Sequence, residues 1–120
     1  MFLFRRLMPL LSLTLGLASS TSAALVDLFS DANCQDLIIA GQNVWDNSCA
    51  VWQKHHYRSY NITYPGGKHQ KVHPFDYSWC VGWKQEHCIR AKVDHTCHRA
   101  DFYPQGYSYA MGSNMLCNIW

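Results

Sequence analysis

The stretch Leu28–Asp36 (LFSDANCQD) has the same skeleton as a later stretch, Pro74–Gly82 (PFDYSWCVG). Each has an aromatic residue at its second position, a cysteine five positions further on, and a small or turn-forming residue seven positions further on. The equivalent pairs are Phe29 and Phe75, Cys34 and Cys80, and Asp36 and Gly82. This parallel predicts one structural unit that is used twice.

The residues before the repeat predict an export signal. Arg5 and Arg6 form a short basic head, a largely apolar run covers 7–18, and 19–24 is small and polar. This pattern is typical of a secretory signal cleaved near Ala23 or Ala24, and the apolar run is shorter than the about 20 residues that a membrane anchor needs. We expect a signal peptide over 1–23, one domain over 24–120, an extracellular location and no transmembrane segment.

The six cysteines all lie in the expected mature chain. Removing the first 23 of 120 residues leaves 97, and a core of that size is marginal without covalent cross-links, so an even cysteine count in an exported chain favours disulfides. A zinc ribbon is not favoured because the sequence has no Cys-x-x-Cys pair. The expected disulfide residues are Cys34, Cys49, Cys80, Cys88, Cys97 and Cys117.

Short alternating segments separated by turn residues predict an all-β fold. Leu25–Phe29 alternates so that Val26 and Leu28 share one face. Pro65–Gly67 is the strongest turn signal and falls between the two repeats. Only 85–92 has helical character, in a stretch too short to be a persuasive helix.

Asn61-Ile62-Thr63 is an N-glycosylation sequon. Strand alternation places Tyr60 and Ile62 inward and Asn61 toward solvent, which is the orientation that a sugar requires. We note Asn61 as a glycosylation site, with an unused sequon as the alternative.

The charge of the mature chain argues against binding to nucleic acid. Without Arg5 and Arg6, the ten lysines and arginines fall to eight, which equals the eight aspartates and glutamates. A basic patch for phosphates therefore lacks support. The seven histidines would make the protein cationic in a mildly acidic fluid, because their ordinary pKa is near 6.5.

Three histidine pairs are candidate metal ligands. Residues four apart on a strand share a face but lie about 13 Å apart, too far to hold one ion without a bend. We expect exposed histidines that carry pH-dependent charge and no metal or other cofactor, with metal binding as the alternative. The pairs are His55 and His56, His69 and His73, and His95 and His98.

An enzymatic alternative is a small secreted ribonuclease. Glu86 is the single glutamate, His87 is next to it and Arg90 lies four positions on. In such ribonucleases a glutamate acts as the general base, histidines act as the general acid, and an arginine binds the phosphate. Neighbours on a strand face opposite ways, however, and no ribonuclease motif surrounds these residues, so we expect no catalytic residues.

Four aromatic residues, most of them near a lysine or histidine, suggest a binding platform. Part of this set could be exposed to bind sugars or a protein partner, although packing in the core is the more frequent use of such residues. The set is Trp52, Tyr57, Trp79 and Trp83.

The repeat resembles the βγ-crystallin Greek-key motif, in which an aromatic residue opens a folded β-hairpin, a glycine seven residues later has a positive φ, and a serine caps the hairpin. Ser59 and Ser113 match the serines, followed by Ile62 and Leu116 at the apolar position. The chain also resembles small cysteine-rich secreted fungal proteins, including killer-toxin-like ones. The resemblance implies a Greek-key β-sandwich of two motifs whose fold residues are Phe29, Asp36, Ser59, Phe75, Gly82 and Ser113.

The chain departs from the family at several positions. Asp36 replaces the first glycine, and Asp tolerates a positive φ less well than Gly. Pro74 confines its strand to an edge or a bulge. The family's calcium positions hold unsuitable ligands, so we expect no calcium binding. These positions are His55, Lys54 and Arg58 in the first copy and Tyr109, Ser108 and Gly112 in the second.

The repeat further suggests how the cysteines pair. Cys34 and Cys49 recur as Cys80 and Cys97, so the simplest scheme pairs each set within its own unit and leaves Cys88 for Cys117. Fifteen pairings are possible for six cysteines.

These expectations and the resemblance together indicate a secreted, non-enzymatic, monomeric binding protein, of the fungal effector or killer-toxin kind. Its expected partner is an extracellular protein, a glycan or an anionic surface. The alternatives are the ribonuclease and an inhibitor of an extracellular hydrolase.

Overall fold

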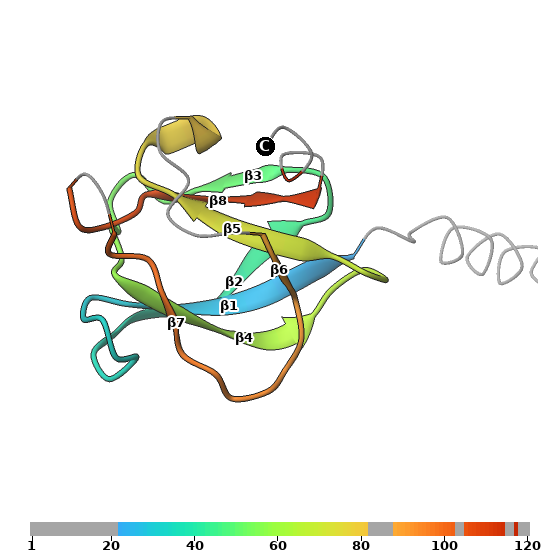
Figure 1. The fold of residues 1–120 in the computed structure, drawn as a ribbon, viewed down its shortest axis with the longest axis horizontal. Helices are drawn as coiled ribbons and strands as arrows, with labels where there is room; N and C mark the ends of the chain where they lie inside the picture. The colour runs from blue at the N-terminus through green and yellow to red at the C-terminus, as the bar shows by residue number, and fades with distance from the viewer. Residues whose placement is uncertain (1–21, 82–87, 103–104, 115–116, 118–120) are drawn as a thin grey trace, which may run out of the picture.

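The computed structural model describes residues 22–81, 88–102, 105–114 and 117, and these residues form two antiparallel sheets (Figure 1). Sheet 1 has the strand order β2-β1-β4-β7 and sheet 2 has the order β3-β8-β5-β6. The strands are β1 (Ala23–Phe29), β2 (Leu37–Trp45), β3 (Cys49–Val51), β4 (Ser59–Pro65), β5 (Lys71–Phe75), β6 (Ile89–Arg90), β7 (His98–Arg99) and β8 (Ala110–Ser113), with a 3-10 turn η1 (Ser78–Cys80).

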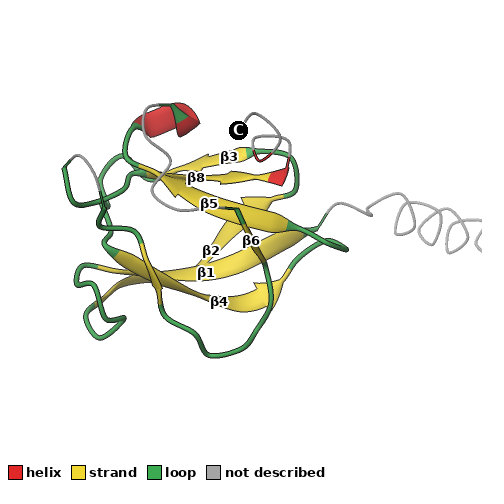
Figure 2. Cartoon of the chain, viewed as in Figure 1, coloured by secondary structure: helices red, strands yellow, loops and turns green. Residues whose placement is uncertain are grey.

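The all-β class is confirmed, and strands and loops make up most of the described chain (Figure 2). The helical segment considered over 85–92 is not helical where it is described, because Ile89–Arg90 form β6. Residues 85–87 lie outside the described part of the chain. The expected signal peptide also lies outside it up to residue 21.

Each half of the chain gives three strands to one sheet and one strand to the other. The first half (β1 to β4) places β3 at the edge of sheet 2, and the second half (β5 to β8) places β7 at the edge of sheet 1. The registers agree as well, because Phe29 at the end of β1 lies opposite Ser59, and Phe75 at the end of β5 lies opposite Ala110. The two halves therefore follow the same plan, and each contributes one strand to the other half's sheet.

The core lies between the sheets and contains the residues that strand alternation predicts. Val26 and Leu28 in β1 are fully buried, and so are Tyr60 in β4 and Val72 in β5. Burying one large apolar side chain contributes about 1.5–3 kcal/mol to folding. Pro74 is also buried, and β6 pairs only with Lys71 and Val72. The strand β5 is thus not an edge strand as expected, because β6 lies beyond it, but the pairing with β6 ends before Pro74, where a ladder donor is missing.

The turn expected at Pro65–Gly67 joins the two halves. Gly66 has a φ of 74°, and a Cβ there would overlap with the backbone of Ala24 and the side chain of Gln70. Glycine is required at this position for both reasons. Gln70 closes the turn by accepting a hydrogen bond at Oε1 from the Gly67 N–H, at 2.9 Å.

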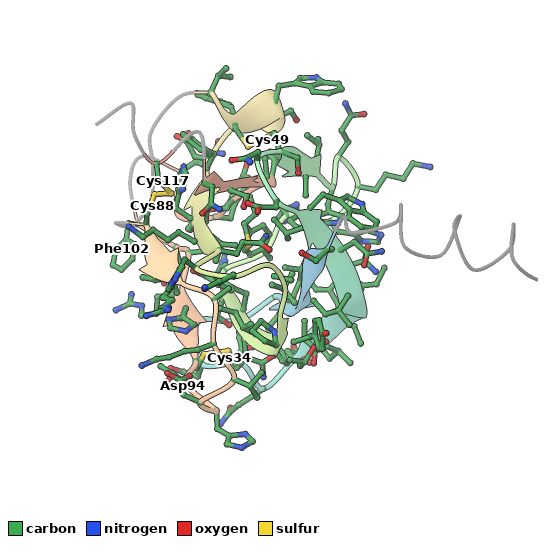
Figure 3. The ribbon with its side chains drawn as sticks, turned by 90° about the vertical axis from the view of Figure 1, so that its right-hand side faces the viewer. Cys34, Cys49, Cys88, Asp94, Phe102 and Cys117 are labelled. Carbon is green, nitrogen blue, oxygen red and sulfur yellow. A yellow bond between two sulfur atoms is a disulfide. The ribbon has the colours of Figure 1, made fainter. Side chains whose placement is uncertain are left out.

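Three disulfides are present, but two of them do not follow the expected scheme (Figure 3). Cys88 pairs with Cys117 as expected. The other two bonds join Cys34 to Cys97 and Cys49 to Cys80, so pairing within each unit is wrong. In Figure 3, Cys34 and Cys49 lie near opposite ends of the molecule.

The exchange of strands explains the pairing. Cys97 immediately precedes β7, which lies in the first half's sheet, so its sulfur faces Cys34 of the first half. Cys49 begins β3, which lies in the second half's sheet and meets Cys80. The equivalence of Cys34 with Cys80 and of Cys49 with Cys97 was correct. The two bonds are therefore equivalent to each other, and both join one half to the other.

Two expected fold-motif residues have other roles. Asp36 is absent from the described residues with a positive φ, whereas Cys34 and its equivalent Cys80 have φ values of 56° and 54°. The left-handed residue is thus the cysteine, two positions earlier than expected. Ser113 lies opposite Val72, three residues beyond Ala110, the true equivalent of Ser59. Gly82 and Leu116 lie outside the described residues.

Candidate functional site

A shallow hollow opens beside the disulfide of β3 and η1. It has a volume of about 410 Å³, which is within the range of small-ligand sites. We call it the Trp52–Trp79 hollow. Its lining residues are Val51, Trp52, Gln53, Lys54, His55 and Trp79.

Trp79 is the most exposed large hydrophobic residue in the described chain. Its side chain is 70% exposed, and it lies in η1 with a φ of 64°. The next residue, Cys80, is also left-handed. A non-glycine residue in this conformation costs about 1–3 kcal/mol, and such strain persists only where the surroundings impose it. Here the Cys49–Cys80 disulfide anchors the strained segment to β3.

Trp52, in contrast, forms a fixed part of the hollow. Its ring packs edge-on against the buried ring of Tyr57, with 5.7 Å between centroids. Its indole Nε1–H donates a hydrogen bond to Oε1 of Gln42, at 3.2 Å. The Trp52 carbonyl accepts a hydrogen bond from the His55 N–H at 3.0 Å, which closes the chain into a turn at the rim.

The polar lining of the hollow is basic and neutral. Lys54 and Gln53 are exposed and His55 is half-buried. The described lining contains neither aspartate nor glutamate. The arrangement combines one free indole, one fixed indole, an amide and a cation, which suits a ligand with a flat apolar face and polar or anionic edges.

The structure brings together two of the four aromatic residues that were expected to form a platform. Trp52 and Trp79 line the same hollow. Tyr57 is fully buried, and its hydroxyl donates to the Ala110 carbonyl at 2.7 Å, so it belongs to the core. Trp83 lies outside the described residues. Val51 and Gln53 were missed, because nothing in the sequence distinguishes them from other strand and loop residues.

The expectation of exposed histidines is wrong for His73. This residue is fully buried in β5, and its Nδ1 lies 2.9 Å from Sγ of Cys88 and 3.3 Å from Sγ of Cys117. The three residues have the types and proximity of a metal-binding group. Because the two sulfurs are bonded to each other, however, they are not thiolates, and cysteine ligates zinc as a thiolate.

The other described histidines lie outside this group of potential metal ligands. His55 is half-buried and His56 is exposed. His69 is exposed and lies on Arg90, with Nδ1 2.6 Å from Nη2, whereas His73 is buried. His95 is exposed. His98 is half-buried and stacks on Tyr60, with 5.2 Å between ring centroids. Burial lowers the pKa of His98, although the nearby Asp94 carboxylate raises it in part.

The ribonuclease residues receive little support from the described structure. Glu86 and His87 lie outside the described residues. Arg90 is exposed in the short strand β6, where it pairs with Lys71 of β5. Its Nη2 atom contacts Nδ1 of His69.

Asn61 lies in β4 between the buried residues Tyr60 and Ile62, as alternation predicts. Asn61 itself is half-buried, and its Oδ1 atom is shielded from solvent without a hydrogen-bond partner in the described structure. Thr63 of the sequon donates to the Leu25 carbonyl at 3.3 Å. Glycosylation of Asn61 stays a prediction.

Among the described residues, no helix is both long and apolar enough to span a bilayer. Comparisons with family models, with curated proteins and with solved structures gave no match to this chain.

Proposed function

We propose that this chain is a secreted, non-enzymatic binding protein with a βγ-crystallin type Greek-key fold, of the fungal effector or killer-toxin kind. It contacts an extracellular or cell-surface target through the Trp52–Trp79 hollow. The predicted export signal and the three disulfides support action outside the cell.

The fold assignment is supported by the strand plan. Each half places three strands in its own sheet and lends its third strand to the other sheet. In the first half, Ser59 caps the loop after β1, because its Oγ accepts from the Cys34 N–H at 3.0 Å and donates to the Asp31 carbonyl. This is the contact that the resemblance assigns to the serine.

The observation that carries the binding proposal is the exposure of Trp79. An indole that is 70% exposed on a strained turn contributes little to the core. Its apolar surface faces water, and a partner that covered this surface would gain free energy. Tryptophan is enriched among the residues that dominate binding energy at interfaces. A disulfide that fixes the turn reduces the entropy lost when a partner binds.

The test compares two exposed tryptophans. The mature protein and its Trp79→Ala and Trp45→Ala variants are incubated with intact cells and insoluble cell-wall material, and the bound fraction is measured. Trp45 is 49% exposed in β2 and lies outside the hollow, so it is the matched control. We expect Trp79→Ala to weaken binding about tenfold or more and Trp45→Ala to leave it unchanged.

Equal binding by all three proteins would contradict the role of the hollow. Hydrolysis of RNA by the purified mature protein, lost in Glu86→Gln, would contradict the non-enzymatic assignment. Inhibition of an extracellular hydrolase that survives Trp79→Ala would identify the protein as an inhibitor that uses another surface.

A further inference from the structure

We infer that the Trp52–Trp79 hollow binds an acidic oligosaccharide, with one sugar ring stacked on Trp79 and a uronate carboxylate paired with Lys54. The inference rests on the proposed function and names the class of ligand. It follows from three properties of the hollow, which are its open indole, its hydrogen-bonding rim and its charge.

The open indole suits a pyranose ring. A sugar ring presents C–H groups on one face and hydroxyl groups around its edge, so it packs flat against an aromatic ring while its hydroxyls stay hydrated. Trp79 is 70% exposed, and the hollow beside it is shallow. The hollow is therefore open enough to admit a sugar ring face-on.

The rim supplies hydrogen bonds on one side of that ring. The Gln53 amide is exposed and can both donate and accept, which matches the dual character of a hydroxyl group. Trp52 is held by Tyr57 and Gln42, so the floor of the hollow is preorganised. Preorganisation lowers the entropy cost of binding.

The charge of the lining selects an acidic sugar. Lys54 is exposed, and no carboxylate occurs among the described lining residues to compete for it. An exposed ion pair is worth about 0.2–1 kcal/mol, so Lys54 gives a modest preference for a carboxylate. Stacking on Trp79 provides the larger share of the affinity.

The same observations favour a saccharide over a nucleic acid. Single-stranded nucleic acid also stacks on aromatic side chains, but it requires a groove of cations that follows successive phosphates. The hollow offers a single lysine and a half-buried histidine. The described lining therefore lacks the row of cations that successive phosphates require.

The experiment uses one saccharide in two charge states. Tetragalacturonate and its fully methyl-esterified form share a backbone but differ in charge, and each is titrated into the mature protein by calorimetry and by tryptophan fluorescence. We expect the acid form to bind more tightly by about threefold. Trp79→Ala should weaken both forms by about tenfold or more, and Trp45→Ala should weaken neither.

Lys54→Gln sharpens the test, because it should remove the preference for the acid form and leave the affinity for the ester unchanged. Near-UV circular dichroism and a disulfide map verify that each variant is folded. Lys92→Gln is the matched control, since Lys92 is exposed but lies outside the hollow.

Equal affinity for the acid and the ester would overturn the inferred role of Lys54. Tighter binding of a single-stranded RNA oligonucleotide than of either saccharide would overturn the ligand class. If neither saccharide binds while Trp79-dependent binding to cells persists, the ligand inference fails and the proposed function stands. If Trp79→Ala also leaves binding to cells intact, both fail.

Discussion

The two loops that follow the repeated phenylalanines are equivalent in position but different in use. In the first loop (residues 30–36), the Asp31 carboxylate accepts hydrogen bonds from the N–H groups of Asn33, Gln35 and Asp36. In the second loop (residues 76–81), the positions of Asp31 and Asn33 are taken by Tyr77 and Trp79, which are 49% and 70% exposed. One loop stabilises itself, while the other presents aromatic rings to solvent.

The serine position shows the same difference. The Ser59 hydroxyl bridges Cys34 and Asp31 of the first loop, whereas the equivalent Ala110 has no hydroxyl group to give to the second loop. Both loops are held by a disulfide, because Cys34–Cys97 in the first loop is equivalent to Cys49–Cys80 in the second. The comparison teaches that two loops held by equivalent disulfides can differ in their polar contacts and in the side chains that they expose.

Removing either of the two equivalent disulfides should have the largest effect on stability. We expect both Cys34→Ser/Cys97→Ser and Cys49→Ser/Cys80→Ser to lower the free energy of unfolding by about 2–5 kcal/mol. The first bond spans 63 residues and the second 31, so loop entropy makes the loss of the first larger by about 0.6 kcal/mol. Urea unfolding measures both.

The two disulfides should affect binding in the opposite order to stability, so that the loss of Cys49–Cys80 has the larger effect. Loss of the Cys49–Cys80 bond releases the turn that holds Trp79, so it should abolish binding at the hollow. Loss of the Cys34–Cys97 bond should leave binding intact below the unfolding transition. A variant without the Cys49–Cys80 bond that still binds with full affinity would contradict the idea that the disulfide positions Trp79.

Ser59→Ala should destabilise the protein by about 1–3 kcal/mol, because it leaves the Cys34 N–H without its acceptor. Thermal or urea unfolding of the mature protein measures the effect. Ser30→Ala is the control, since Ser30 is an exposed residue of the same loop. A change in stability no larger than that of the control would show that the first loop does not depend on its serine.

Asp31→Ala should lower the melting temperature, and Tyr77→Ala at the equivalent position should leave it nearly unchanged. Hydrogen bonds from the Asp36, Gln35 and Asn33 N–H groups lower the pKa of Asp31 below 3.8. Its stabilising effect is therefore complete above pH 3.8 and is lost as the pH falls through the lowered pKa. Melting curves from pH 7 to pH 2 should converge for wild type and Asp31→Ala at the acid end. Curves that stay parallel would contradict this role.

The smallest effect is expected in the exchanged strands, where His98 in β7 corresponds to Ala50 in β3. Burial lowers the folded-state pKa of His98 below the ordinary 6.5. Below pH 6.5 the unfolded chain takes up the proton first, so stability falls as the pH decreases toward the lowered pKa. His98→Gln should flatten the stability profile between pH 6.5 and pH 5, while His95→Gln at an exposed position should not. Identical slopes in the two variants would count against His98.

The repeated elements could be predicted from the sequence. The crossing of one strand from each half into the sheet of the other half could not. Phe29 and Phe75 end equivalent strands, and the correspondence of Cys34 with Cys80 and Cys49 with Cys97 holds. The pairing failed because it depends on β3 and β7 crossing to the other sheet, and local patterns carry no information about long-range topology. Ser113 was misplaced by three residues because serines are frequent and the motif is short.

The prediction of an aromatic platform was correct for two of its four residues. The predicted aromatic platform included Trp52 and Trp79, which line the hollow. It also included Tyr57, which is buried in the core and donates its hydroxyl to the Ala110 carbonyl. The left-handed backbone at Trp79 has no glycine to signal it. The sequence also did not show that Cys80, next to Trp79, pairs with Cys49.

The crossing disulfides affect how the protein would survive digestion. The joint between the halves contains the exposed residues Lys68 and His69, so a protease that attacks surface turns would cut there first. Such a nick separates Cys34 and Cys49 on one fragment from Cys97 and Cys80 on the other, and both bonds between them stay closed. The nicked molecule would therefore migrate as one species on a gel until a reducing agent parts it.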